Sequence, residues 1–280
     1  MSGLIKPAPW AFTPAFVDPK WRFFWEQNRY TLPAWEGGGV PFPITGKQRG
    51  AATLTSVDWS TSTLGRSLLF DADTDIVDLP LLELDGLPQI TICLLMEWAA
   101  VPDTTDATYA FQFTYTGGPT AQFFSPAGGT QWRLRIDAGG GQGVINDDDA
   151  DSYKGVPRLI HCVYDGANVF IYKDGIEAVS GALTGTIDQD AGSSPINRLG
   201  TQFDGTEAFE GHIYFLSVSD NAFTPGQVAV HARDFFGPFS MADEVGVISV
   251  PAVGDPSADT LAFMPGQHQP VFEPPTAIGY

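Results

Sequence analysis

The sequence predicts an all-β fold, an antiparallel β-sandwich with one short helix, carried between extended N- and C-terminal arms. The 280-residue chain holds 31 Gly and 22 Pro, which favours many turns and few long helices. Aromatic residues make up 12% of the chain and suit the pleated faces of strands. Short apolar runs separated by turn residues recur through the middle of the sequence, which is typical of a sandwich or barrel.

The first predicted element is an extended arm over residues 1–50. Prolines punctuate it, yet it is rich in aromatic rings, which disordered linkers usually lack. Two interpretations stay open: the rings fill pockets on a partner, or the arm folds back on its own domain. The predicted partner-binding residues of this arm are Trp10, Phe12, Phe16, Trp21, Phe24, Trp25 and Trp35.

Residues 51–240 are predicted to form the sandwich. An Asp-rich turn separates the first two strands, and Thr224, Pro225 and Gln227 supply the N-cap, first-turn proline and capping box of a helix that runs to about Arg233. The predicted strands cover residues 67–70, 75–79, 90–98, 109–115, 120–124, 131–136, 158–164, 168–173 and 211–219.

The last predicted element is a proline-rich arm over residues 241–280. Its six prolines between positions 251 and 275 exclude a continuous helix and fit poorly in a central strand. Phe263 and Phe272 complete the predicted partner-binding residues.

Charge and cysteine content exclude several classes of protein. Acidic residues number 33 against 14 basic ones, so a nucleic-acid phosphate backbone is not an expected partner. The chain has no membrane-length apolar run, and its first ten residues do not resemble a signal peptide, so we expect a protein made in a cytoplasm. Cys93 and Cys162 lie in apolar runs and are predicted to be buried free thiols, with a disulfide between adjacent strands as the alternative.

The sandwich motifs follow one another in a fixed order. They are an opening hairpin at 68–71 and 76–80, a "TI…W" strand at 89–98, a "DG" strand pair at 160–166 and 169–175, and the last strands at 197–200 and 209–213. Their order resembles laminin-G-like, concanavalin A-like jelly rolls. The resemblance covers residues 51–240, and it is the ordered series of motifs that carries it. Residues 233–239 also resemble the segment that follows such domains in tailed-bacteriophage structural proteins.

The resemblance includes glycoside hydrolases, but this chain departs from their pattern. Glu83 and Asp85 are expected on one face of a strand, where a retaining hydrolase needs two carboxyls about 5 Å apart. The hydrolases then require another Glu soon after, and here Gly86-Leu87-Pro88 follows. We therefore predict no catalytic residues and no enzyme activity.

The chain also has segments that resemble phosphate, metal or sugar sites. Residues 139–143 are rich in glycine but lack the Lys-Ser/Thr that follows in a phosphate loop, so a flexible turn is expected there. Asp71, Asp73 and Asp75 fail the EF-hand pattern and are expected in a hairpin turn, and residues 147–151 in a solvated loop, with calcium as an alternative. The four histidines show no metal-ligand spacing, so no metal site and no cofactor are predicted. Trp59, Trp98 and Trp132 are candidate sugar platforms, although core positions are the default for tryptophan.

Two functions follow from these expectations. The first is a non-catalytic virion structural protein of a tailed phage, of the capsid decoration, cement or head-fibre type, whose arms bind other virion proteins such as the major capsid protein. The alternative is a carbohydrate-binding adhesin module that recognises a surface glycan. A homo-oligomer is compatible with both.

Overall fold

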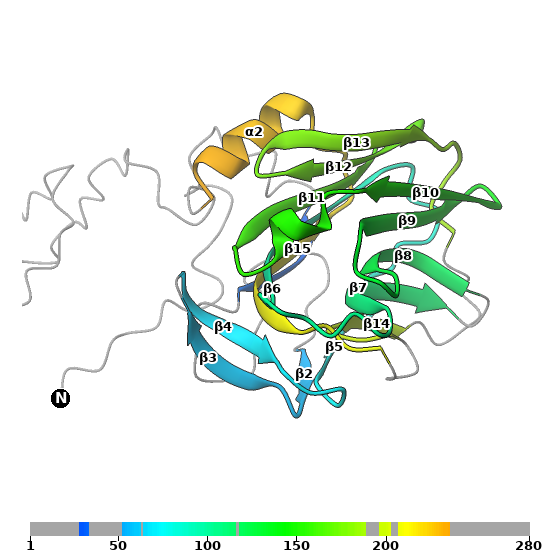
Figure 1. Cartoon of the computed structure of the whole chain (residues 1–280). Helices are drawn as coiled ribbons and strands as arrows, with labels where there is room; N and C mark the ends of the chain where they lie inside the picture. Colours follow the sequence, from blue (N-terminus) through cyan, green and yellow to red (C-terminus); the bar gives the residue numbers. More distant parts are fainter. Residues whose placement is uncertain are drawn as a thin grey trace, which may run out of the picture.

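The computed structural model describes residues 28–33, 52–62, 64–115, 118–188, 196–202 and 207–235, and within them it forms two packed antiparallel sheets and one α-helix (Figure 1). We call the sheets sheet I and sheet II. The all-β sandwich predicted from the sequence is confirmed.

Sheet I has the strand order β13-β12-β11-β6-β15-β4-β3, and β1 pairs with β15 on the same side as β4. β4 covers residues 211–213 of β15, and β1 covers residues 215–219. The bounds are β1 Asn28–Pro33, β3 Asp58–Ser62, β4 Gly65–Phe70, β6 Ile90–Trp98, β11 Arg158–Tyr164, β12 Asn168–Lys173, β13 Ile176–Ala182 and β15 Gly211–Ser219.

Sheet II has the strand order β10-β9-β8-β7-β14-β5-β2. Alternation along its strands is clear: in β9 the buried positions alternate with partly exposed ones from Trp132 to Ala138. The bounds are β2 Thr53–Thr55, β5 Ile76–Leu79, β7 Thr108–Tyr115, β8 Gly118–Ser125, β9 Trp132–Ala138, β10 Gly141–Asp147 and β14 Ile196–Leu199.

The main core lies between the two sheets and is dominated by aromatic rings. Phe123 stacks on Trp132 at 4.8 Å between ring centroids, and Trp98 meets Trp132 edge to face at 5.2 Å. Burial of rings of this size supplies most of the apolar contact between the sheets.

A second, smaller core lies on the opposite face of sheet I, under helix α2 (Pro225–Arg233). Val228 of the helix is fully buried there against strand residues such as Leu159 and Val163. The predicted capping box is confirmed: the backbone N–H of Thr224 donates to Gln227 Oε1 at 2.8 Å, and that of Gln227 donates to Thr224 Oγ1. The fold is therefore three layers, α2, sheet I and sheet II.

The strand pairs with Asp-Gly turns are also as expected. β12 and β13 form a hairpin in which Asp174 and Gly175 both adopt positive φ, at 52° and 88°. Two residues with positive φ are what a type I′ hairpin turn requires.

Three predictions about local structure are wrong. The Asp-rich turn does not join a hairpin, because β4 belongs to sheet I and β5 to sheet II, so the chain crosses between sheets there. Glu83 and Asp85 do not lie on a strand, since residues 80–89 form no regular element and Glu83 has a φ of 49°. The glycine-rich segment around Gly141, read as a flexible turn, turns only at Gly139 and Gly140 and then enters β10.

One described segment of the predicted N-terminal arm folds back on the sandwich. Residues 28–33 form β1, in which Tyr30, Thr31 and Leu32 are buried. The fold-back alternative holds for this segment; residues 1–27 and 34–51 lie outside the described residues. Of the helices in the described ranges, none has the length and apolar character needed to cross a bilayer.

Candidate binding surface

The nine aromatic residues predicted to bind a partner lie outside the described residues. They are Trp10, Phe12, Phe16, Trp21, Phe24, Trp25, Trp35, Phe263 and Phe272. Their assignment stays a prediction, and the candidate surface must be found on the sandwich itself.

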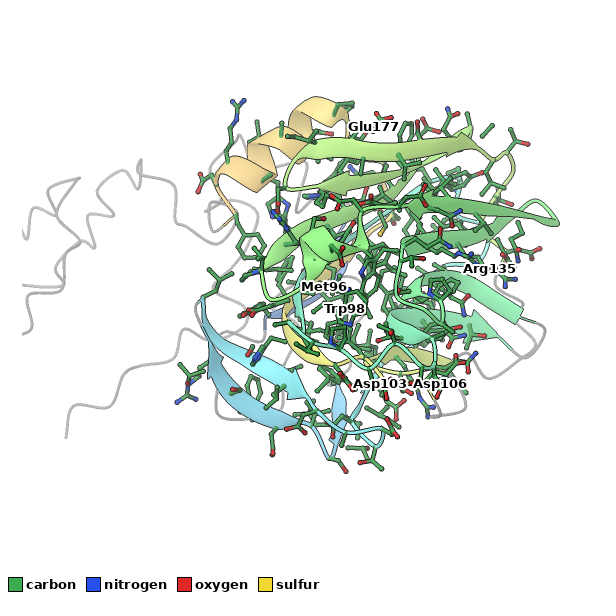
Figure 2. All side chains as sticks on the ribbon, in the orientation of Figure 1. Met96, Trp98, Asp103, Asp106, Arg135 and Glu177 are labelled. Carbon is green, nitrogen blue, oxygen red and sulfur yellow. The ribbon has the colours of Figure 1, made fainter. Side chains whose placement is uncertain are left out.

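The candidate tryptophan platforms are mostly core residues. Trp98 and Trp132 are completely buried, and Figure 2 places Trp98 in the interior of the molecule, whereas Arg135 lies toward its periphery. Trp59 on β3 is only partly buried and packs against the main core. Trp98 and Trp132 are therefore excluded as sugar platforms.

The acidic segments are used for structure. Asp75 is buried, and its Oδ2 accepts the backbone N–H groups of Asp71 and Ala72 at 2.8 and 2.9 Å, which ties the crossover between the sheets. Glu83 and Asp85 are exposed on either side of the buried Leu84, outside any strand.

The prediction of a solvated loop at residues 147–151 is wrong for Asp147. It ends β10 with only 8% of its side chain exposed, and Tyr153 donates its hydroxyl to Asp147 Oδ2 at 2.7 Å. Lys173 of β12 reaches the same oxygen at 3.1 Å and also contacts Asp149 at 3.2 Å and Ser152 at 2.8 Å. Burial, reinforced by the hydrogen bond to Asp147, raises the pKa of Tyr153. This network fixes the 3-10 helix η5 (Ala150–Tyr153) against sheet I.

The outer face of sheet II carries a line of hydrogen-bonding side chains that crosses four strands. Arg135 of β9 pairs in register with Gln122 of β8, Gln122 with Gln112 of β7, and Gln112 with Arg198 of β14. Their strand neighbours, such as Ile136, Phe123 and Phe111, point into the core, so these four point away from it. We call Arg135, Gln122, Gln112 and Arg198 the polar row.

Carboxylates hold both ends of the polar row in place. Arg135 donates Nε and Nη2 to the two oxygens of Asp137 at 3.1 and 3.2 Å, and Arg198 donates Nε to Asp78 Oδ1 at 2.7 Å. The arginine side chains are 27% and 20% exposed, whereas the glutamines between them are almost covered. Paired in this way, the guanidinium planes are fixed before a ligand arrives.

An aromatic pair lies beside the polar row. Tyr109 of β7 stacks on Phe124 of β8 at 4.9 Å with an interplanar angle of 10°, and Arg133 lies over the Phe124 ring at 6.0 Å. Gln202 donates to the Tyr109 hydroxyl at 3.4 Å. Sequence reasoning missed this surface because each of its residues looks like an ordinary strand position; only the register of five strands brings them together.

One cluster of described residues could hold a metal ion, although the histidines show no metal-ligand spacing along the chain; the expectation of no metal site stays a prediction. Cys93, His161 and His231, all buried, bring one ligand atom each to within 4.8 Å of one another. Spacing along the chain could not reveal it, since the three residues come from β6, β11 and α2. Cys93 and Cys162 are both free, as predicted, and the strand register explains why: Cys93 lies opposite His161, and Cys162 lies opposite Ile92.

Two solved structures of similar fold are named as binding domains. The receptor binding domain of botulinum neurotoxin C/D mosaic serotype matches with a TM-score of 0.58 at 8% identity, over 74% of this chain and 51% of that one. The binding domain of Paraclostridial Mosquitocidal Protein 1 has a TM-score of 0.58 at 12% identity and covers 75% of this chain. The chain thus spans about half the length of these two structures.

A shorter domain matches almost end to end. Domain 4 of AbnA, an extracellular arabinanase from Geobacillus stearothermophilus solved in complex with arabinotriose, has a TM-score of 0.51 at 18% identity, over 74% of this chain and 99% of that one. No curated protein matches the sequence significantly.

The family is established by the sequence model that matches residues 71–229, more than half of the chain. Its span begins in the crossover after β4 and ends inside α2, so it takes in both sheets. The chain belongs to the concanavalin A-like lectin/glucanases superfamily.

Proposed function

We propose that this sandwich is a non-catalytic carbohydrate-binding module and that the outer face of sheet II is its binding surface. The observation that carries the proposal is the polar row, whose four planar side chains cross the sheet in strand register. Strands lie about 4.8 Å apart, so Arg135 and Arg198 are separated by roughly 14 Å, a span suited to an extended oligosaccharide rather than a single small ion.

The chemistry of this surface suits sugars. The guanidinium groups of Arg135 and Arg198 can bond to vicinal hydroxyls, and the partly exposed Phe124 ring next to them offers an apolar wall to a sugar ring. Arg133, Arg135 and Arg198 gather on this one face of a chain with a net charge of −19.

Hydrolysis is disfavoured by the placement of the carboxylates. Asp137 and Asp78 are the acids paired with the polar row, and each is bonded to an arginine. They lie on β9 and β5, four strand spacings apart, which is roughly 19 Å. Both hydrolytic mechanisms need carboxyls within about 10 Å of each other, so this pair fits a binding surface and not a catalytic one.

The similar structures support the proposal at the level of fold. One was solved with arabinotriose and another, a botulinum neurotoxin binding domain with a TM-score of 0.56, in complex with SialylT. The binding domain of botulinum neurotoxin DC was also solved with rat synaptotagmin II, so a protein receptor is the competing occupant that an experiment must exclude.

The test is a glycan array with the full chain, followed by calorimetry on the glycans retained. Arg135→Ala is expected to weaken binding about 10- to 100-fold, because a hydrogen bond to a charged group contributes about 1.5–3 kcal/mol. Arg158→Ala is the matched control: Arg158 also pairs with an aspartate, Asp174, and its side chain is 28% exposed, but it lies on sheet I. Retention of no glycan, or equal weakening in both variants, would reject the surface.

The virion assignment stays a second prediction, supported by the aromatic composition of the arms. It is tested by co-sedimentation of the full chain with phage particles that lack it, with Trp10, Phe12 and Phe16 changed together to Ala as the variant. Under this assignment the variant loses particle binding and keeps glycan binding. A variant that sediments like the parent chain would contradict it.

A further inference from the structure

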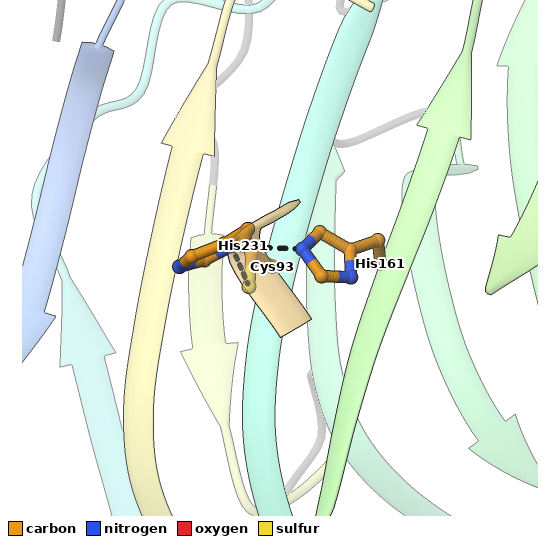
Figure 3. A group of neighbouring side chains, drawn as sticks. All are labelled: Cys93, His161 and His231. Carbon is orange, nitrogen blue, oxygen red and sulfur yellow. Dashed lines mark hydrogen bonds between the residues drawn. The ribbon is translucent and has the colours of Figure 1, made fainter. Parts of the chain in front are cut away.

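One cysteine and two histidines, residue types that commonly ligate metals, meet in the small core between helix α2 and sheet I (Figure 3). Cys93 on β6 and His161 on β11 lie directly opposite each other in the antiparallel register. His231, in the last turn of α2, points from the helix toward sheet I and contacts both side chains. All three residues are completely buried.

The spacing of the ligand atoms is close to that of a coordination site. His161 Nε2 and His231 Nδ1 are 2.9 Å apart, and Cys93 Sγ lies 3.8 Å from the same His231 Nδ1. A tetrahedral zinc ion, with bonds of about 2.05 Å to nitrogen and 2.3 Å to sulfur, would hold the two nitrogens about 3.3 Å apart and a nitrogen and the sulfur about 3.6 Å apart. These two pairs would have to shift by a few tenths of an ångström to accommodate the ion. The third pair, Cys93 Sγ and His161 Nε2, lies within 4.8 Å and would have to close by up to about 1.2 Å.

Hydrogen bonding accounts for only part of this arrangement. A ring nitrogen of a neutral histidine either donates one proton or accepts on one lone pair. His231 Nδ1 therefore makes one good hydrogen bond, yet both His161 Nε2 and Cys93 Sγ are directed at it. A cation placed between the three atoms would use a lone pair from each of them.

The surroundings shield the site from solvent, and the three side chains leave the fourth position of a tetrahedral ion to a small ligand such as water. Aromatic rings enclose the histidines: Phe235 stacks on His231 at 5.5 Å, and Phe215 and Phe223 lie 6.5 and 6.3 Å from the His231 and His161 rings. Burial lowers the pKa of His161 to about 3 and that of His231 well below its usual value, so both imidazoles are neutral. Burial raises the pKa of the Cys93 thiol, and a bound dication would reverse this by stabilising the thiolate.

A hydroxyl group lies beside the cysteine. Ser217 of β15 lies opposite Cys93 in the antiparallel register, so its hydroxyl is placed to donate to the cysteine sulfur. Bound thiolates are commonly supported by such partners around a metal. A set of one thiolate and two imidazoles selects zinc or a softer ion over calcium and magnesium.

We propose that Cys93, His161 and His231 bind one Zn²⁺ ion, which fastens α2 to sheet I. The ion would join three elements that are far apart in the chain, since His161 is 70 residues from His231 and Cys93 is 138 residues from it. The site is independent of the proposed glycan surface, which lies on the other sheet.

The experiment measures metal bound to the full chain, purified without a polyhistidine tag. One zinc per chain is expected after dialysis, and replacement by Co²⁺ should produce a thiolate-to-cobalt charge-transfer band. Cys93→Ser and His231→Gln should lose the bound ion, and Cys93→Ser should lose the band. Cys162→Ala and His212→Gln are the matched controls, a buried thiol on the other face of sheet I and a partly exposed histidine outside the cluster, and both should keep one ion.

A second readout keeps the test valid where a substitution perturbs packing. A chelator should lower the melting temperature of the parent chain but leave that of Cys93→Ser unchanged. A parent chain that holds less than a tenth of an equivalent of zinc and gives no cobalt band overturns the proposal, and so does a Cys93→Ser variant that binds zinc like the parent. Either result would identify the cluster as a hydrogen-bonded contact only.

Discussion

Replacing Asp147 with Ala tests whether burial, rather than short distance, decides how much an ion pair stabilises this sandwich. The substitution removes the acceptor of the fully buried Tyr153 hydroxyl and one partner of Lys173. An unsatisfied buried hydroxyl costs about 1–3 kcal/mol. Lys173 is 18% exposed and keeps its contacts with Asp149 and Ser152. Loss of the Asp147–Lys173 ion pair therefore costs about 1 kcal/mol, well below the 3–5 kcal/mol of a broken, fully buried pair.

The sum predicts a loss of about 2–4 kcal/mol in the free energy of unfolding. Chemical denaturation followed by tryptophan fluorescence measures this directly, and the melting temperature should fall by about 4–16 °C. Asp151→Ala is the matched control, because Asp151 contacts Lys154 at the shorter distance of 2.8 Å but is 89% exposed. It should change stability by less than about 0.5 kcal/mol.

Two results would refute this reasoning. If Asp147→Ala costs less than about 1 kcal/mol, the Tyr153 hydroxyl finds another partner and the buried network does not fix η5. If Asp151→Ala costs as much as Asp147→Ala, exposure is not the deciding variable.

Three further predictions concern packing. Gly211→Ala should destabilise the fold by about 2 kcal/mol more than Gly128→Ala in denaturant unfolding. Both glycines have positive φ, but only a Cβ at 211 would clash with the backbone of Glu97. Equal losses of stability would show that backbone conformation alone decides the effect. Trp132→Ala should lower the free energy of unfolding by about 3–5 kcal/mol in the same assay, and Trp59→Ala should lower it clearly less because Trp59 is only partly buried. A larger loss for Trp59→Ala would show that Trp132 is not central to the core. Neither Cys93 nor Cys162 should react with iodoacetamide in the native protein, and mass spectrometry that finds either thiol modified without denaturant would contradict their burial.

The sequence predicted the elements whose signals are local. The nine predicted strands are all present, and α2 begins and ends where Thr224 and Arg233 indicate, because alternation, capping chemistry and Asp-Gly turns act over a few residues. Strands with weaker alternation, such as β10 after its glycine turn and the largely exposed β13, were missed for the same reason.

The sequence could not predict how the strands pair in register or which sheet each strand joins. The crossover at Asp75 looks like a hairpin turn until β4 and β5 are assigned to different sheets. The polar row needs the pairing of β9, β8, β7 and β14, and the cluster of Cys93, His161 and His231 needs the helix placed over sheet I. Both candidate sites are therefore properties of long-range pairing, which no residue spacing encodes.

The placement of β1 has a practical consequence for anyone who trims this protein. A fragment that starts at residue 51 looks complete by its motifs, yet it would leave Phe215 to Ser219 of β15 with bare backbone donors and acceptors along one side. An open edge of five residues inside a sheet is a template for a strand from elsewhere, so such a fragment should aggregate or borrow the missing strand from a second molecule. A peptide of residues 28–33 added in trans should then act as a plug and restore a monodisperse protein.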